Sequence, residues 1–185
     1  DIEVRLTQIE AGPAEQEAFA RLGQVSVVAE VRAMARTPDG RSQLVEVRAV
    51  DGAYPLYGRV ALAPGGAPDL PQALGALSGA GGAAHGAAVS QELAERLGLG
   101  PGDALELGDG RFRVGAILTE EPDRVGRGFA FGPSVLISRE ALAASGLARP
   151  GSIVQHDYRI RLKDGVGLEE AKKALEDQFP DAQWR

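Results

Sequence analysis

The chain has 185 residues, 44% of them hydrophobic and 25% charged, which suffices for a packed core in one domain or in two small lobes. Its formal net charge of -6 and the lack of a Lys/Arg run argue against a nucleic-acid or anionic-membrane surface. The absence of cysteine excludes disulfides, Cys-type zinc sites and thiol catalysis.

The first fifty residues predict a strand, a helix and a long hairpin. Apolar and charged residues alternate over residues 2–6, the period of a half-buried strand. Pro13 suits the first turn of a helix, and Gly23 suits its end. Alternation then continues over residues 25–50 on both sides of a turn at residues 37–40, which predicts two antiparallel strands.

The next segment, residues 63–88, is rich in Gly, Ala and Pro and shows no sustained period. We interpret most of it as loop, with one helical turn near residues 70–77. The glycines at residues 79–82 predict a flexible connection. A phosphate-binding loop is disfavoured because no Lys-Ser/Thr pair follows them.

The middle of the chain predicts two short capped helices and a hairpin. Ser90 suits an N-cap and Gly98 the end of the first helix. Residues 103–118 predict a hairpin around an Asp-Gly turn. Ser138 predicts the start of a second helix that Gly146 closes.

The pattern of strand-like alternation followed by helical spacing, seen at the start of the chain, recurs at its end. Residues 158–162 alternate like a strand, and residues 168–179 follow helical spacing until Pro180. Residues 182–184 predict a further strand. Strand, helix and strand therefore occur once at each end of the chain.

This symmetry predicts an α+β fold with two lobes. Residues 1–49 and 152–185 would form one lobe, two β-α-β units packed as an open-faced sandwich, and residues 50–151 would be inserted as a mostly-β second lobe. It also predicts that Asp1 and Arg185 lie near each other. The chain begins and ends within strand-like sequence, so we expect a domain of a longer protein.

No arrangement in the sequence predicts catalysis, and we expect no catalytic, cofactor-binding or metal-binding residues. His85, in a Gly/Ala segment, and His156, ahead of a strand, lack a second ligand at metal-binding spacing, and we interpret both as surface histidines. No Gly-x-Ser-x-Gly or Gly-x-Gly-x-x-Gly motif occurs.

Two polar or aromatic clusters are candidate contact sites. Residues 120–124 carry three carboxylates and a guanidinium, which we interpret as a solvated turn with an internal ion pair. Two tyrosines flank Pro-Leu on a loop, where they could pack between the lobes or anchor a partner. The candidate partner contacts are Tyr54, Leu56, Tyr57, Asp123 and Arg124.

Several motifs resemble the extracytoplasmic domains of ABC-transporter permeases of the FtsX and MacB type, and within these the YbbP-like group. They follow one another along nearly the whole chain, and the second and fourth are the most specific. The motifs are Asp-Ile-Glu-Val-Arg at 1–5, Val-Asp-Gly-Ala-Tyr-Pro-Leu-Tyr-Gly at 50–58, Leu-Gly-Leu at 97–99, Glu-Pro-Asp-Arg at 121–124 and Pro-Gly-Ser at 150–152.

The resemblance implies a non-catalytic domain on the periplasmic side of the bacterial inner membrane, built from porter and sabre subdomains. It implies that a separate cytoplasmic ABC ATPase subunit uses the ATP, that a second permease copy pairs with the first, and that motion is relayed across the membrane. A periplasmic protein or a lipid-like substrate would be the further partner. The domain itself is expected to bind no cofactor.

Two other functions are left open by the residues. A periplasmic module for lipids or other hydrophobic ligands would use residues 63–88 and the tyrosine loop to line an apolar cleft. A hydrolase has the least support, because no nucleophile, base or metal constellation is present.

Overall fold

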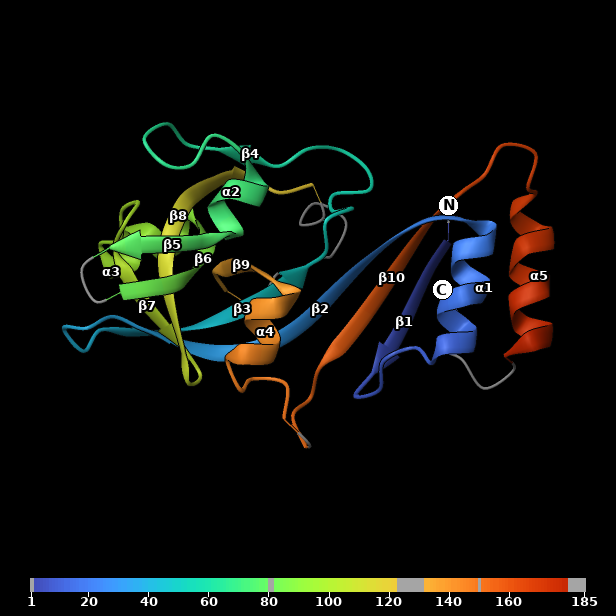
Figure 1. Cartoon of the computed structure of the whole chain (residues 1–185), viewed down its shortest axis with the longest axis horizontal. Coiled ribbons are helices and arrows are strands. Elements are labelled where there is room, and N and C mark those ends of the chain that lie inside the picture. Colours follow the sequence, from blue (N-terminus) through green and yellow to red (C-terminus); the bar gives the residue numbers. More distant parts are fainter. Residues whose placement is uncertain (1, 80–81, 123–131, 150, 180–185) are drawn as a thin grey trace.

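The computed structural model describes residues 2–79, 82–122, 132–149 and 151–179, which form a ten-stranded mixed sheet and five helices (Figure 1). The strands are β1 (Ile2–Thr7), β2 (Gly23–Arg36), β3 (Ser42–Val50), β4 (Ala61–Leu62), β5 (Ala76–Gly79), β6 (Gly82–Ser90), β7 (Ala104–Leu107), β8 (Gly110–Glu120), β9 (Ser134–Ser138) and β10 (Gln155–Leu162). The helices are α1 (Pro13–Leu22), α2 (Leu70–Leu74), α3 (Gln91–Leu97), α4 (Arg139–Ala144) and α5 (Leu168–Gln178).

The two ends of the chain build one lobe, here called the helical lobe, as the sequence predicts. β10 lies between β1 and β2 and is antiparallel to both. α1 and α5 lie side by side next to these strands (Figure 1). The helices cover one face of the sheet, where Phe19 of α1 packs against Tyr158 of β10 with 5.4 Å between ring centroids. The core of this lobe comprises Ile2, Val4, Ala11, Ala18, Phe19, Tyr158, Ile160, Ala171 and Leu175.

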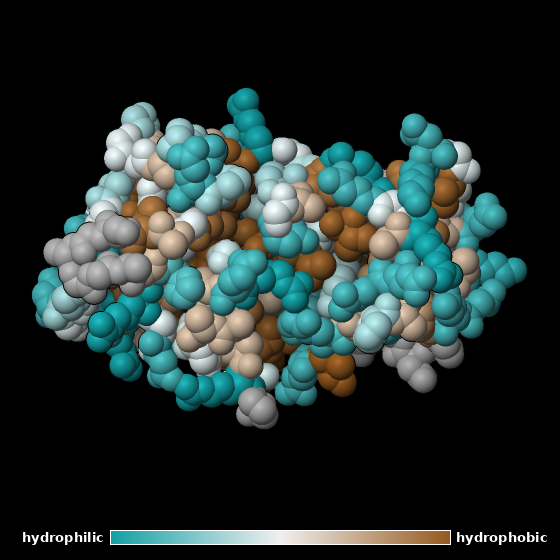
Figure 2. Space-filling view, viewed as in Figure 1, coloured by the Kyte–Doolittle hydropathy of each residue, from teal (hydrophilic) through white to brown (hydrophobic). Residues whose placement is uncertain are grey.

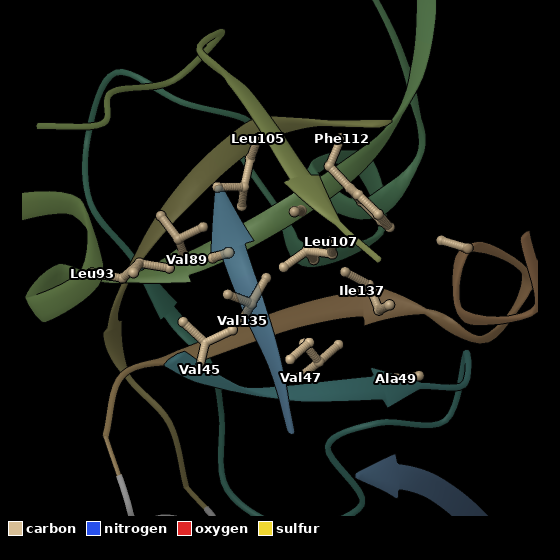
Figure 3. Packing of buried hydrophobic residues seen from close by; sticks show 14 of the residues in the cluster. Val45, Val47, Ala49, Val89, Leu93, Leu105, Leu107, Phe112, Val135 and Ile137 are labelled. Carbon is tan, nitrogen blue, oxygen red and sulfur yellow. The ribbon is translucent and has the colours of Figure 1, made fainter. Parts of the chain in front are cut away.

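The inserted lobe has its main core on the other half of the same sheet. β3 pairs with β9 in parallel, and β9 leads through β6 to β8. Figure 3 shows the alternating residues of β3 packing against side chains of β6, β7, β9 and α3. Fully or nearly fully buried members include Val45, Val47, Ala49, Val89, Leu93, Leu105, Leu107, Phe112, Val135 and Ile137.

The predicted capped helices and the hairpin of the inserted lobe are confirmed. The Ser90 hydroxyl accepts a hydrogen bond from the Leu93 amide, and the Ser138 hydroxyl accepts one from the Ala141 amide. Gly98 ends α3 with a left-handed φ of 58°, a conformation that glycine adopts without steric cost. β7 and β8 form the expected hairpin.

The interpretation of residues 63–88 as mostly loop is wrong. This segment contains α2, β5 and most of β6, and β6 pairs with β8 and β9. A Cβ atom on Gly86 of β6 or on Gly115 of β8 would lie 2.2 Å from the Ala73 carbonyl oxygen of α2. Small residues therefore let α2 approach the sheet. Because the segment is rich in small residues, it also lacks the alternation of apolar and polar residues that would predict a strand from sequence.

The turn of the β2–β3 hairpin lies in the inserted lobe. A Cβ on Gly98 at the end of α3 would lie 2.7 Å from Arg41 Nη1. The hairpin turn therefore contacts α3. Side chains of β3 and of the second half of β2 join the core of the inserted segment.

The proposed division at residues 49/50 and 151/152 stays a prediction. The predicted strand at residues 182–184 and the expected proximity of Asp1 and Arg185 lie outside the described residues. Among the helices that the structure describes, none combines the length and the apolarity needed to span a membrane.

Candidate functional site at the junction of the lobes

The loop that follows β3 is fastened to β2 by a single carboxylate. Asp51 accepts hydrogen bonds from the Val27 amide at 2.7 Å, the Ser26 hydroxyl at 3.0 Å and the Ala53 amide at 3.1 Å. Bonds from Val27 and Ser26 hold the loop against β2, and the bond from Ala53 shapes its first turn. Asp51 thus sets the course of the motif that carries both tyrosines.

The first half of the tyrosine loop is buried. Tyr54 is 9% exposed and Leu56 is 4% exposed. The Arg48 guanidinium lies 5.6 Å from the centroid of the Tyr54 ring, and its Nη1 donates to the Tyr54 hydroxyl at 3.4 Å. These two candidate contacts therefore pack inside the molecule.

The second half of the tyrosine loop reaches back to the helical lobe. Tyr57 is 41% exposed, and the guanidinium of Arg161 in β10 lies 4.6 Å from its ring centroid. Arg161 also donates a hydrogen bond to the Leu56 carbonyl. The loop is consequently held by β2 through Asp51 and by β10 through Arg161.

A buried ionic cluster lies beneath the loop. Arg48 of β3 donates to Glu30 of β2 at 3.0 Å and forms an ion pair with Glu121, which follows β8. The three side chains are 4%, 9% and 3% exposed. Glu121 also accepts from the Ser134 hydroxyl at 3.0 Å. Burial of this kind is stable only while each carboxylate keeps its charged partner.

The interpretation of residues 120–124 as a solvated turn is wrong for Glu121, which is buried and paired with a residue 73 positions away. The next residue also packs inward, since a Cβ on Gly58 would lie 2.7 Å from Pro122 Cβ. The two most specific motifs of the sequence, at 50–58 and 121–124, therefore meet in space. Asp123 and Arg124 lie outside the described residues.

The polar contacts continue across the helical lobe on the face opposite α1 and α5. Gln155 donates to Glu30 at 3.5 Å and to Asp157 at 3.3 Å. Asp157 is 1% exposed and accepts from Arg5 Nε at 2.8 Å. A chain of hydrogen bonds and ion pairs thus runs from β1 through β10 and β2 to β3 and β8.

The two histidines differ from their predicted surroundings. His85 lies in β6, with its ring centroid 5.8 Å from that of Phe112, and not in a loop. His156 is 5% exposed, so its interpretation as a surface residue is wrong. Burial lowers the pKa of the His156 imidazole, and nearby Arg139 lowers this pKa further, against the opposite effect of Glu10.

Sequence reasoning did not single out Glu30, Arg48 or Arg161. A signal for the first two exists in the hairpin, because its register places Glu30 directly opposite Arg48. Arg161 alternates with buried residues of β10 and is indistinguishable in sequence from any solvent-facing arginine. Within the described ranges, no group of three or more His, Asp or Glu side chains could hold a metal ion. The expected lack of cofactors stays a prediction.

Buried ion pairs and a loop held by both lobes position the backbone at the junction. Residues 3–178 match the family model of the MacB-like periplasmic core domain, so the chain belongs to that family. It is a non-catalytic periplasmic domain of an ABC transporter permease.

One curated relative is an uncharacterized ABC transporter permease of Escherichia coli K12, YbbP. It is 30% identical over 118 residues, which are 64% of this chain and 13% of that protein. The chain thus spans only a small part of this relative.

Two solved structures share the fold. The extracellular domain of the noncanonic ABC-type transporter YknZ from Gram-positive bacteria has a TM-score of 0.60 and 13% identity, with 99% of each chain covered. The periplasmic region of MacB from Actinobacillus actinomycetemcomitans has a TM-score of 0.58 and 8% identity, with 100% of this chain and 86% of that chain covered.

Proposed function

We propose that this domain relays ATPase-driven conformational change across the inner membrane into the periplasm. The energy would come from a cytoplasmic ABC ATPase subunit bound to the full-length permease, which would pair with a second permease copy. The observation that carries the proposal is the path of β2, which packs Val25 and Val27 on the helical-lobe core and places Ala29 and Val31 in the inserted-lobe core. Movement of one lobe would therefore be passed to the other.

The contacts at the junction support a relay in which movement of one lobe is passed to the other without the strands sliding past one another. A hydrogen-bonded sheet resists shear, and β2 alone has 14 residues that pair with β10, β3 and β7 in turn. Asp51 and Arg161 clamp the loop between the lobes, and the Arg48 cluster ties β2 to the end of β8. A helical lobe attached to moving membrane helices would swing the inserted lobe as a lever.

We further propose that the domain contacts a periplasmic protein or a lipid-like substrate as it moves. Most of the face in Figure 2 is hydrophilic, and hydrophobic surface interrupts it near the middle of the long axis. Tyr57, half-exposed on its loop, is the candidate contact that best fits this role. A partner bound at Tyr57 would respond to movement of the junction between the two lobes.

A periplasmic hydrophobic-ligand module is the alternative function. It needs a cleft between the tyrosine loop and residues 63–88, but Tyr54 packs in one core with Ala73 and Leu74 of α2. Leu56 is buried as well. Side chains that would line the cleft thus pack with their neighbours, which favours the relay.

The relay can be tested in the full-length permease assembled with its ATPase. A spin label at Ala143→Cys on exposed α4 would report the distance between the inserted lobes of the two copies, and one at Ala20→Cys on exposed α1 would report the helical lobes. We expect both distances to change between the nucleotide-free and ATP-bound states. An α4 distance that stays constant while ATP is hydrolysed would refute the relay.

A further inference from the structure

His156 lies where the two cores meet. Along one face of the chain, Val154 belongs to the core of the inserted lobe and Tyr158 to the core of the helical lobe, with His156 between them. Its cross-strand neighbours repeat this division, since Leu6 of β1 packs on the helical-lobe core and Ala29 of β2 belongs to the inserted-lobe core. A titratable side chain thus occupies the seam between two apolar clusters.

One carboxylate oxygen connects this histidine to the other lobe. Glu10 Oε1 lies 3.6 Å from His156 Nδ1. The same oxygen lies 3.0 Å from Nη2 of Arg139, which is the first residue of α4. No described residue forms a hydrogen bond with the buried Nδ1. The Glu10 segment is held on β10 by the Gln8 amide, which donates to the Val154 carbonyl at 2.7 Å, and by the Ala11 amide, which donates to the Tyr158 hydroxyl at 2.9 Å.

Few charged groups of the described part of the chain lie around the imidazole. Glu10 and Arg139 share its side of the sheet. Asp157, the next residue of β10, points to the opposite face, where it pairs with Arg5 of β1, and Glu30 of β2 lies on that opposite face as well. Among the carboxylates that the structure describes, Glu10 is therefore the one that can approach an imidazolium at this position.

We propose that His156, Glu10 and Arg139 form an acid-sensitive latch between the lobes, in which protonation of His156 draws the Glu10 carboxylate away from Arg139 and releases α4. The proton comes from solvent and no other group is consumed. The latch would regulate the relay proposed above. Only this regulatory role rests on the proposed function, whereas the latch itself rests on the contacts of His156, Glu10 and Arg139.

The difference in solvent exposure between His156 and Arg139 determines which of these two cations pairs with the Glu10 carboxylate. The His156 side chain is 6% exposed and that of Arg139 is 32% exposed. A buried imidazolium cannot be hydrated and needs a charged partner, whereas a half-exposed guanidinium regains water when it loses one. Acidification therefore moves Glu10 toward His156. In neutral solution the buried imidazole is uncharged and Glu10 stays with Arg139, which joins the helical lobe to α4.

The first measurement follows the two imidazoles of the 185-residue chain by NMR. His85 and His156 are the only histidines, so His85→Gln assigns both signals. We expect the midpoint of His156 to lie below the ordinary histidine value of 6.5. Glu10→Gln should lower this midpoint further by removing the attracting carboxylate, and Arg139→Gln should raise it by removing the repelling guanidinium. Unchanged midpoints in both variants would overturn the proposed geometry.

The second measurement uses the absence of cysteine to place a spin-label pair at Ala20→Cys on α1 and Ala143→Cys on α4. We expect one narrow distance population at neutral pH and an added, longer population at about pH 5. His156→Gln should stay narrow at both pH values, Glu10→Gln should be broad at both, and His85→Gln should behave like the parent chain.

Two outcomes would overturn the latch. One is a distance that does not change although His156 is seen to become protonated. The other is the same acid-induced change in His156→Gln, since that change would come from other groups. Because both measurements use the isolated chain, they can fail while the relay in the membrane is upheld, and they can succeed while the relay is refuted.

Discussion

The guanidinium of Arg161 in β10 lies over the ring of Tyr57, 4.6 Å from its centroid, and donates a hydrogen bond to the carbonyl of Leu56. The two residues are 104 positions apart and belong to different lobes. Arg161 therefore holds the half-exposed tyrosine loop against the helical lobe.

Replacing Arg161 is expected to loosen this loop. Arg161→Ala removes a cation-π contact and a charge-assisted hydrogen bond, so the free energy of unfolding should fall by about 1–2 kcal/mol. Urea denaturation gives the stability, and hydrogen exchange at residues 54–58 localises the effect. Tyr57→Phe keeps the ring and serves as the control, with a change within about 0.5 kcal/mol. Equal losses in both variants would contradict the stacking role.

Disrupting the buried ionic cluster at Arg48 should lower the free energy of unfolding by more than Arg161→Ala does. Arg48→Met leaves Glu30 and Glu121 buried without their shared guanidinium, and we expect a loss of about 3–5 kcal/mol. Arg32→Met, on the exposed part of the same face, should change stability by less than about 1 kcal/mol. Chemical denaturation of both variants provides the comparison, and similar losses would argue against a special role for burial.

Asp51 is expected to act through its three hydrogen bonds. Asp51→Ala leaves the Val27 amide, the Ser26 hydroxyl and the Ala53 amide without this acceptor, which should cost about 2 kcal/mol. Asp51→Asn keeps one acceptor oxygen and should lose less. Faster hydrogen exchange of the Val27 and Ala53 amides in the alanine variant would identify the site, and unchanged exchange there would count against the clamp.

The close approach of α2 to the sheet gives a steric test. Gly86→Ala and Gly115→Ala each place a Cβ 2.2 Å from the Ala73 carbonyl, so α2 must move and stability should fall by about 3 kcal/mol. Gly52→Ala is the matched control because, apart from its two chain neighbours, no described residue has a heavy atom within 4 Å of the added Cβ. If the control is as destabilised as the other two, glycine content and not packing explains the loss.

The stability of the chain should depend on pH through His156. Burial lowers the pKa of this imidazole in the folded state, so below its ordinary value of 6.5 the unfolded chain binds the proton more readily. Stability that is present above pH 6.5 is therefore lost as the pH falls toward the lowered value. Urea denaturation across this range should show a weaker pH dependence in His156→Gln than in His85→Gln, and equal slopes would contradict the assignment.

Local patterns in the sequence account for much of the fold. Alternation identifies β1, the β2–β3 hairpin and β10, helical spacing identifies α1 and α5, and serine hydroxyls place the starts of α3 and α4. These signals are readable because each element buries one face or closes its own end. The strand-helix-strand repeat at both chain ends predicts the helical lobe for the same reason.

Other features depend on partners far along the chain. β6 is buried by α2, β8 and β9, so small residues take the place of an alternating pattern, and no local signal remains. The sequence by itself therefore determined the family, the two-lobe α+β class and most element boundaries. Only tertiary structure decided that Glu121 and His156 are buried, because burial of a charged or titratable group depends on the strands and partners that surround it.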